Sequence, residues 1–269
     1  MEINTSFFGE SESQFINQFL ENGYVTFPLE DIAVLKQMKK RIYSWSLEIL
    51  NISESVEIDH FFNYTQHYLN GSQLNDFRLQ LIAKIARDQS NRSAIFSLSK
   101  LHLDWIVGNE LAMQRNINLS LQLPGDSSSL LPLHTDVWSG NSPYEVVFWF
   151  SLVDCYRTKS AFILPKKESD EVFRHFKEYA VLSTEQFYQK IKDRLIWLEI
   201  PYGHGVIFSH ILIHGGHINQ EEESRWSFNV RFKSLLSPYA VKELGESFLP
   251  ITIRPVTRYG YNYKKPKVL

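Results

Sequence analysis

The second half of the chain constrains the fold most, because apolar and polar residues alternate there in short segments. From Asn116 onward, INLSLQLP puts leucines on one face of an extended strand and Asn118, Ser120 and Gln122 on the other. Further strand-like runs, separated by turn residues, are YEVVFWFSLVD, SAFILP, LIWLEIP, GVIFSHILIH and SRWSFNVRFKSL. Many short strands joined by turns are typical of a β-sandwich or barrel. We therefore expect residues 116–262 to form a barrel of the jelly-roll type.

The first 115 residues differ, because their apolar residues recur every three or four positions, as in amphipathic helices. The pattern predicts helices over 11–22, 29–51, 77–86 and 94–110, with helical character again over 167–193. The aromatic stretch HFFNYTQHYLNGS between two of these helices reads as a loop. The predicted class is α+β, a single domain over 1–269 in which a mainly helical part, 1–115, packs on the barrel.

Composition excludes several classes of partner. The 269 residues are 43% hydrophobic, which is enough for one large core, and the formal net charge of −2 gives no basic excess for nucleic-acid binding. Cys155 is the single cysteine, so no intrachain disulfide forms, and the acidic, polar N-terminus is unlike a signal peptide. No apolar run approaches the roughly 20 residues that a membrane span needs. We expect a cytoplasmic protein that binds neither membrane nor nucleic acid.

The stretch LPLHTDVWSG, residues 131–140, places a histidine and an aspartate two positions apart in apolar surroundings. In a β-strand, His134 and Asp136 would point to the same face. A buried carboxylate without a partner is energetically expensive. A metal ion or hydrogen bonds from the neighbouring backbone would each supply that partner.

A second histidine-rich stretch, HILIHGGHINQ, lies about eighty positions further on. If 205–214 is one strand, His210 and His214 share a face, and the glycine pair that follows places His214 at the strand end. Together with the earlier histidine and aspartate, His214 would complete a set of two imidazoles and one carboxylate. That set is the facial triad of non-haem Fe(II) oxygenases.

An arginine lies eleven residues after His214, at the start of the run SRWSFNVRF. In a strand beginning near Ser224, four polar side chains point the same way: Arg225, Ser227, Asn229 and Arg231. A guanidinium fork binds a carboxylate with two hydrogen bonds. Arg225 is therefore a candidate to hold one end of a diacid whose other end reaches the metal.

These motifs carry a family resemblance. HTDVW, HGGHIN and SRWSFNVRF resemble the Fe(II)/2-oxoglutarate oxygenases of the phytanoyl-CoA hydroxylase superfamily, which carry H-x-D, a distal H-G followed by an asparagine, and an arginine eleven residues after that histidine. The segment LQLPGDSSSLLPLHTDVWSGNSPYEVVFWFSLVDCYRTKSAFILP is similar to a bacterial branch found sporadically in carbohydrate biosynthesis clusters. The resemblance covers roughly residues 116 to 262. It implies a double-stranded β-helix, a cupin-like jelly-roll barrel, with N-terminal helices packed on it.

The resemblance also implies a metal site and a chemistry. The implied Fe(II) ligands are His134, Asp136 and His214, with no further catalytic residue beyond the metal site. The co-substrates are 2-oxoglutarate and O₂. Iron halogenases of related fold replace this carboxylate with a small residue so that chloride can bind the metal. Asp136 therefore disfavours halogenation and favours hydroxylation or another oxidation.

Further residues follow from the same resemblance. Arg225 is implied to pair with the far carboxylate of 2-oxoglutarate. The other implied contacts of the co-substrate are Ser227, Trp149 and Gln122, with Asn118 and Ser120 as alternatives to Gln122. The candidates on the substrate side are Trp138, His217 and Arg231.

The expected function is oxidation of a carbohydrate-derived small molecule in bacterial glycan or natural-product biosynthesis. Two alternatives remain open. The histidine spacing in HILIHGGH also occurs in zinc sites, which would indicate a hydrolase that works without O₂. The aromatic residues Trp138, Tyr144 and Trp197 would suit a metal-free jelly roll that binds carbohydrate without catalysis.

Overall fold

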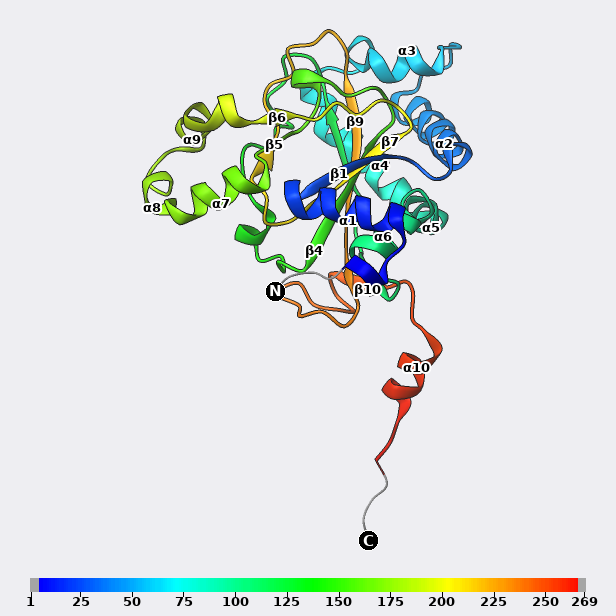
Figure 1. Ribbon diagram of the computed structural model, residues 1–269. Helices are drawn as coiled ribbons and strands as arrows, with labels where there is room; N and C mark the ends of the chain where they lie inside the picture. Colours follow the sequence, from blue (N-terminus) through cyan, green and yellow to red (C-terminus); the bar gives the residue numbers. More distant parts are fainter. Residues whose placement is uncertain (1–4, 266–269) are drawn as a thin grey trace.

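Two antiparallel sheets form the centre of the computed structural model, which describes residues 5–265 (Figure 1). The strands of the larger sheet are, in order, β1 (Tyr24–Pro28), β7 (His204–Ser209), β4 (Glu145–Ser151), β9 (Arg225–Ser234), β2 (Leu111–Gln114) and β10 (Phe248–Pro250). A seventh strand, β3 (Asn118–Gln122), also pairs with β9. The smaller sheet has the order β6 (Ile196–Trp197), β5 (Phe162–Ile163) and β8 (His214–Gly215).

Helices cover the larger sheet on one face. They are α1 (Glu10–Asn22), α2 (Ile32–Leu50), α3 (Ile58–Asn63), α4 (Gly71–Arg87), α5 (Ser90–Ser97) and α6 (Lys100–Ile106). Trp226 of β9 points into this layer, where its ring contacts those of Phe61, Phe62 and Phe77. The alternation along β9 therefore sends its aromatic side chains to the helices and leaves the other face for polar residues.

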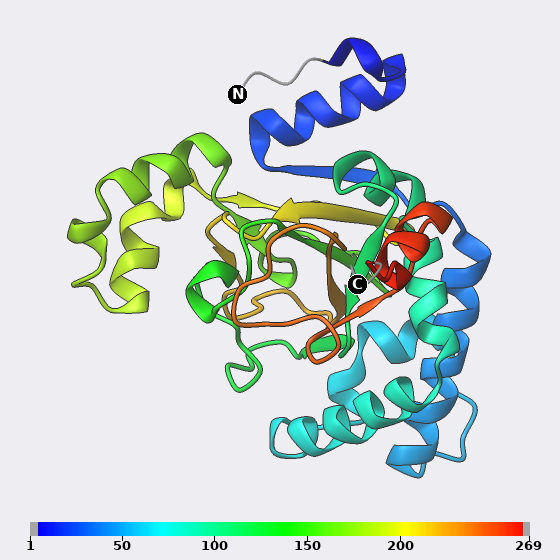
Figure 2. The ribbon, with the colours of Figure 1, turned by 90° about the horizontal axis from the view of Figure 1, so that it is seen from below.

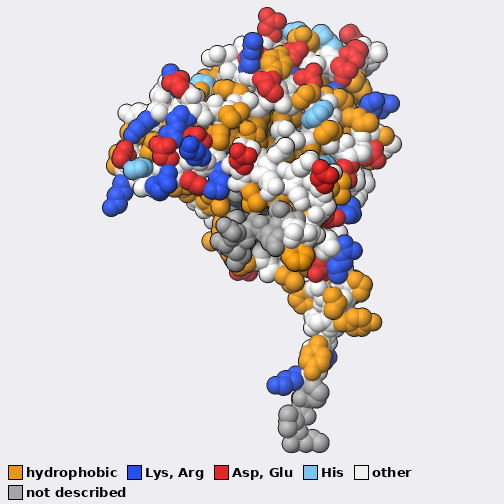
Figure 3. Space-filling view, in the orientation of Figure 1, with side chains coloured by type: hydrophobic (Ala, Val, Ile, Leu, Met, Phe, Trp, Pro, Cys, Tyr) orange, Lys and Arg blue, Asp and Glu red, His pale blue; other side chains and the backbone are white. Residues whose placement is uncertain are grey.

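A second helical group lies beyond the first. It consists of α7 (Lys166–Arg174), α8 (Phe176–Tyr179) and α9 (Thr184–Ile191), on the opposite side of the sheets from α2 to α5 (Figure 2). It contacts the first group through α7 and α1. Its apolar side chains form a separate cluster that includes Phe162 and Ile213. On the face shown in Figure 3, lysine and arginine side chains gather over this group and are interspersed with acidic ones. The last helix, α10 (Pro255–Asn262), projects away from the body (Figure 1).

Short 3-10 helices complete the chain: η1 (Thr5–Phe7), η2 (Thr65–His67), η3 (Asp136–Ser139), η4 (Arg157–Lys159) and η5 (Lys192–Arg194). Within the described residues, no helix is both long enough and apolar enough to cross a membrane.

The predicted α+β class is confirmed, with three local corrections. The stretch at 60–72, predicted as a loop, contains the end of α3, all of η2 and the start of α4. The helix predicted over 94–110 is two helices, after which the chain turns into β2. The strand predicted over 205–214 is broken, because β7 ends at Ser209 and the Leu212 amide donates a hydrogen bond back to the Ser209 carbonyl oxygen in a turn.

Candidate metal centre

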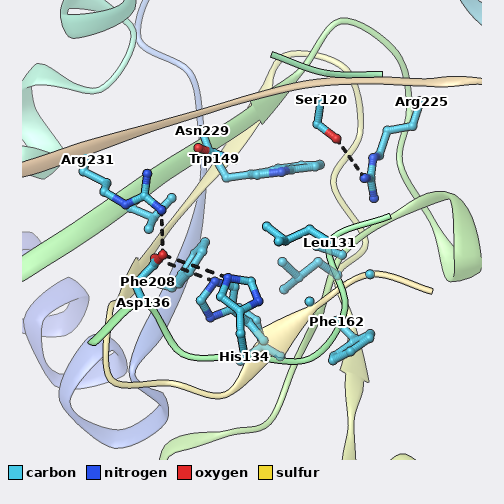
Figure 4. A pocket seen from close by; sticks show the side chains of 17 residues that line it. Ser120, Leu131, His134, Asp136, Trp149, Phe162, Phe208, Arg225, Asn229 and Arg231 are labelled. Atoms are coloured by element: carbon cyan, nitrogen blue, oxygen red, sulfur yellow. Dashed lines mark hydrogen bonds and ion pairs between the residues drawn. The ribbon is translucent and has the colours of Figure 1, made fainter. Parts of the chain in front are cut away.

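A pocket lies between the two sheets (Figure 4). The larger sheet contributes polar side chains on β3 and β9 and the apolar Val147, Trp149 and Phe208. The smaller sheet contributes Phe162 and the start of β8, and the loop before η3 closes one side. Alternation explains this arrangement, because Phe148 and Phe150 of β4 lie in the main hydrophobic core while Val147 and Trp149 also line the pocket.

Three predicted metal ligands meet at one end of this pocket. One potential ligand atom from each of His134, Asp136 and His214 lies within 4.8 Å of those of the other two. Nε2 of His134 is 3.9 Å from Oδ1 of Asp136, and Nε2 of His214 is 3.8 Å from Oδ2. The two imidazole centroids are 4.3 Å apart. Two residues close together in the sequence and one eighty positions away thus form a single cluster.

The backbone brings the two histidines together directly. The amide of His134 donates to the carbonyl oxygen of His214 and the amide of His214 donates back, each over 2.9 Å. Gly215 makes this approach possible, because a Cβ there would lie 2.9 Å from the backbone atoms of Pro132 and Leu133. A residue without a side chain is therefore required beside the ligand histidine.

Hydrogen bonds orient both rings toward the same point. Nδ1 of His134 is 2.8 Å from the carbonyl oxygen of Pro132, and Nδ1 of His214 is 2.9 Å from that of Leu212. A carbonyl oxygen only accepts, so Nδ1 carries the proton in each ring and Nε2 keeps a free lone pair. Burial, with a smaller contribution from His134, lowers the pKa of His214 to about 4. The ring is therefore neutral at pH 7, as a metal ligand must be.

Asp136 reaches the cluster by a different geometry from the predicted one. The chain is extended at Thr135, but Asp136 begins the 3-10 helix η3 and is not part of a strand with His134. Its Oδ1 accepts a hydrogen bond of 2.6 Å from Nη2 of Arg231, while its buried Oδ2 has no hydrogen-bond partner among residues 5–265. Burial alone would raise the pKa of Asp136, but His210, Arg231 and His214 outweigh it and hold the pKa well below its usual range.

His210 lies behind Asp136 and was not assigned a role from the sequence. Its ring is fully buried, with Nε2 3.4 Å from Oδ2 of Asp136 and Nδ1 3.2 Å from Oε2 of Glu145. Glu145 is in turn fixed by the amide of Ser142, which donates to its Oε1 over 2.9 Å. Burial lowers the pKa of His210 to about 3 and raises that of Glu145. An imidazole thus separates the candidate metal ligand from a second buried carboxylate.

The zinc alternative requires His210, His214 and His217 to converge, and they do not. The ring of His217 stacks on Tyr188, with 4.6 Å between centroids, and His217 does not line the pocket. Within the described part of the chain, the group that could hold a metal joins His214 to His134 and Asp136 instead.

At the other end of the pocket lies Arg225, which is only 6% exposed. Its Nη1 donates to the carbonyl oxygen of Ser160 over 3.0 Å, and its Nη2 donates to Oγ of Ser120 over 3.1 Å. No carboxylate within residues 5–265 makes an ion pair with it, and its buried Nε has no partner there. Burial lowers the pKa of Arg225, yet a guanidinium stays charged in proteins. A buried cation with only neutral partners therefore faces the pocket.

The remaining predicted contacts of the co-substrate divide into two groups. Trp149 lines the pocket. Ser227 is buried on β9, and Gln122 is buried on β3 with its Nε2 donating to the His217 carbonyl oxygen over 2.7 Å, but neither lines the pocket. On β3 the pocket is lined by Ser120, the predicted alternative to Gln122, and on β9 by Asn229, which shares the predicted polar face with Arg225. The alternation of both strands was the signal for them.

Of the three predicted substrate contacts, one lines the pocket and two do not. Arg231 lines the pocket and contacts Asp136. Trp138 is 46% exposed and packs against Phe173 and Phe176 of the second helical group. It does not line the metal pocket. His217 contacts α9 through Tyr188, as described above. Of these candidates, Arg231 is the one that the fold places beside the metal cluster.

The chain was compared with known protein families, sequences and structures. No family model and no curated protein sequence matches the chain. Among solved structures, the alpha-ketoglutarate-dependent carbocyclase SnoK from nogalamycin biosynthesis matches with a TM-score of 0.53 and 15% identity, covering 94% of this chain and all of its own. The nickel complex of the non-haem monooxygenase ThoJ matches with a TM-score of 0.51 and 15% identity, over 89% of this chain and 84% of ThoJ.

A third match has both a metal and a co-substrate in its structure. HygX from Streptomyces hygroscopicus, with nickel and 2-oxoglutarate bound, has a TM-score of 0.51 and 12% identity, over 84% of this chain and 88% of HygX. At such identities the likeness establishes a shared fold. The protein therefore has the fold of these non-haem enzymes.

Proposed function

We propose that this protein is a non-haem Fe(II)- and 2-oxoglutarate-dependent oxygenase that acts on a small molecule. One observation carries the proposal. The same pocket holds a cluster of two histidines and one carboxylate at one end and Arg225, a buried cation without a carboxylate partner, at the other. A metal and a dicarboxylate that spans the two ends would satisfy both.

The donor set fits a ferrous ion. Nε2 of His134, Nε2 of His214 and an oxygen of Asp136 would hold it from one side. Oδ2 of Asp136 has no hydrogen-bond partner among residues 5–265, and Nε2 of each histidine has a free lone pair. These atoms are available to coordinate the ion. When bound, the metal would supply the activation of O₂, which no side chain performs alone.

The opposite end fits the distal carboxylate of 2-oxoglutarate. Removing a charge from water without a counter-charge is costly, so a bound anion would compensate the buried charge of Arg225. Ser120 already holds one arm of the guanidinium and would position it for two hydrogen bonds to that carboxylate. Trp149 would cover the methylene groups. Ser227 and Gln122 remain proposed contacts, and HygX, whose structure contains nickel and 2-oxoglutarate, supports the pairing of metal and co-substrate.

We include the finer fold in this proposal: a double-stranded β-helix forming one domain over 1–269. The strand order supports it. The bridge from His134 to β8 adds a fourth segment to the smaller sheet, which then runs bridge, β8, β5 and β6 opposite the larger sheet. The pocket between two such sheets is where cupin-like barrels hold their ligands.

The proposed substrate is a carbohydrate-derived small molecule, and the proposed outcome is hydroxylation or a related oxidation in the cytoplasm. SnoK, named a carbocyclase, shows that proteins of this fold carry out other outcomes as well. In this chain the residues around the metal cluster, Arg231 and Asn229 among them, would orient the substrate and exclude water.

The proposal is tested by succinate formation from 2-oxoglutarate, measured with and without Fe(II), O₂ and sugar candidates. We expect succinate only when both iron and O₂ are present, and inhibition by N-oxalylglycine, a 2-oxoglutarate mimic. A zinc hydrolase would be active without O₂ and indifferent to N-oxalylglycine. A binding module would leave 2-oxoglutarate unconsumed under every condition.

A further inference from the structure

A second, more polar pocket adjoins the candidate metal centre. Its walls come from the end of β2, from β9 and from the segment between β9 and β10. Three basic residues line it: Arg115, Arg231 and Lys242. Arg231 also lines the metal pocket, so one guanidinium belongs to both.

Two of these cations, the exposed Arg115 and the half-buried Lys242, make no ion pair with a carboxylate of residues 5–265. Arg115 is held by main-chain carbonyl oxygens of Gly245 and Glu246, which orient its guanidinium without neutralising it. Lys242 makes no hydrogen bond or ion pair with any residue from 5 to 265, and the carboxylate of Glu246, although it lines the pocket, pairs with neither cation.

The electrostatic surroundings of Lys242 agree with this description. Burial and then the nearby charge of Arg231 lower the pKa of Lys242, and they outweigh the carboxylates of Asp136 and Glu145, which act in the opposite direction. Like charges held close together have this effect on each other. A bound anion would relieve the repulsion.

Arg231 connects this pocket to the reaction site. Its Nη2 donates to Oδ1 of Asp136 over 2.6 Å, its Nη1 donates to Oε1 of Gln114 over 3.2 Å, and its buried Nε has no partner among residues 5–265. Figure 4 shows the guanidinium pointing toward the metal cluster. A molecule that contacts Arg231 in the polar pocket is therefore separated from the candidate metal ligand Asp136 by a single side chain.

We propose that this pocket binds the phosphate group of a phosphorylated substrate. The inference rests on the proposed function for its account of what happens at the metal, and it adds the substrate class. Three cations from three separate segments suit a tetrahedral dianion, whereas a planar carboxylate is matched by one arginine fork. The neutral polar side chains of Gln114, Asn116 and Ser247 also line the pocket and would bind the hydroxyl groups of the same molecule.

The test is calorimetric titration of the full chain, loaded with Ni(II) and saturating 2-oxoglutarate so that Arg225 is occupied. The ligands are inorganic phosphate, glucose 1-phosphate, uridine diphosphate and acetate. We expect saturable binding of phosphate and of at least one phosphate ester, with acetate at least tenfold weaker. Glucose 1-phosphate binding more tightly than uridine diphosphate would identify a sugar phosphate, and the reverse order a nucleotide-linked substrate.

Variants locate the binding. Lys242→Gln and Arg115→Gln should each raise the Kd for phosphate at least tenfold, and Lys242→Arg should restore most of the affinity. Lys177→Gln is the matched control, because Lys177 is exposed on α8, outside the pocket lining. Absence of saturable phosphate binding, or a Kd that is unchanged in both glutamine variants, would overturn the proposal.

The two proposals fail separately. Metal and 2-oxoglutarate binding, measured on the same samples, should be unchanged in Lys242→Gln. If both bind normally while phosphate does not bind, the phosphate site alone is wrong. If 2-oxoglutarate does not bind but phosphate binding depends on Lys242, the phosphate site stands and the oxygenase function is wrong.

Discussion

The two ends of the central pocket are built in opposite ways. At the metal end, a neighbouring group fixes each side chain: a backbone carbonyl oxygen contacts the ring of each candidate ligand histidine, Arg231 contacts Asp136, and His210 lies between two carboxylates. At the other end, Arg225 is a lone buried charge with two neutral partners. The first end is organised before any ligand arrives, whereas the second is electrostatically complete only with a bound anion.

Because of this difference, substitutions at the two ends should affect protein stability and ligand binding differently. Removing a group at the metal end should disturb both the metal and the groups that it leaves unpaired. Removing the charge at the Arg225 end should weaken 2-oxoglutarate binding while relieving the folded protein of an uncompensated charge. The predictions that follow use this contrast, from the largest effect to the smallest.

Asp136→Ala should remove Fe(II) binding, with a Kd raised by well over about 100-fold, because a ligand is lost and Arg231 is left without its carboxylate. The metal-free variant should also be less stable, by about 1–3 kcal/mol, since Arg231 keeps some contact with solvent. Equilibrium metal titration and urea unfolding measure the two effects. Asp193→Ala, at an exposed aspartate, is the matched control. Wild-type iron affinity in Asp136→Ala would remove Asp136 from the ligand set.

Arg225→Gln should raise the Kd for 2-oxoglutarate by about 30-fold or more, the effect of losing one partner of a buried charge pair. Fe(II) affinity should not change. The metal-free variant should be as stable as the wild type or slightly more stable, because a buried uncompensated charge has gone. Arg254→Gln, at an exposed arginine, serves as control. A marked loss of stability without loss of 2-oxoglutarate binding would mean that Arg225 is structural.

His210→Ala should weaken Fe(II) binding by about 10- to 100-fold, the usual effect of removing a group that orients a metal ligand. His210→Gln should recover part of this affinity because the glutamine amide can donate a hydrogen bond to Asp136. His102→Ala is the matched control, since His102 is a largely enclosed ring that stacks on Phe27 and does not line the metal pocket. If His102→Ala and His210→Ala weaken metal binding equally, the effect of His210 is only on stability.

The pH dependence of stability should come largely from buried histidines, two of which, His210 and His214, lie at the metal end. The pKa of His214 is lowered to about 4 and that of His210 to about 3, in both cases chiefly by burial. Between pH 6.5 and these values the unfolded chain binds protons that the folded chain does not. The free energy of unfolding should therefore fall as the pH drops from 6.5 toward 4, by up to about 1.4 kcal/mol per pH unit for each histidine.

Urea unfolding of the metal-free protein at pH 7, 6 and 5 measures this slope. His210→Ala should make it shallower, and so should His102→Ala, because burial also lowers the pKa of His102 to about 4. Arg225→Gln should leave the slope unchanged, since a guanidinium does not titrate in this range. Equal stability of the wild type at pH 7 and pH 5 would contradict the neutral, buried state of these rings.

The sequence predicted the layers and the polar face of β9, because strand periodicity and burial are local properties. It could not predict that Asp136 starts a 3-10 helix or that the chain turns after Ser209, since tertiary contacts decide both. The spacing of the histidines indicated a ligand set, yet the same spacing suggested His217, which the fold turns toward α9.

The side-chain contacts between neighbouring strands could not be predicted from the sequence either. Alternation put Ser120 and Gln122 on one face of β3, and only the register with β9 decides which reaches Arg225. Gln122 lies directly opposite Arg225 but donates to the His217 carbonyl oxygen, so the diagonal Ser120 makes the contact. The contacts of Asp136 with Arg231 and His210 join three distant segments and have no local signature.

The central claim is that one pocket binds a ferrous ion at the histidine end and 2-oxoglutarate between that ion and Arg225. An anaerobic titration tests it most directly: Fe(II) is added to the full chain, then 2-oxoglutarate, while the visible spectrum is recorded. The account predicts a metal-to-ligand charge-transfer band that saturates at one equivalent of iron, is absent in Asp136→Ala, and needs far more 2-oxoglutarate in Arg225→Gln. A wild-type protein that gives no band at any concentration, or a band unaffected by either substitution, would contradict it.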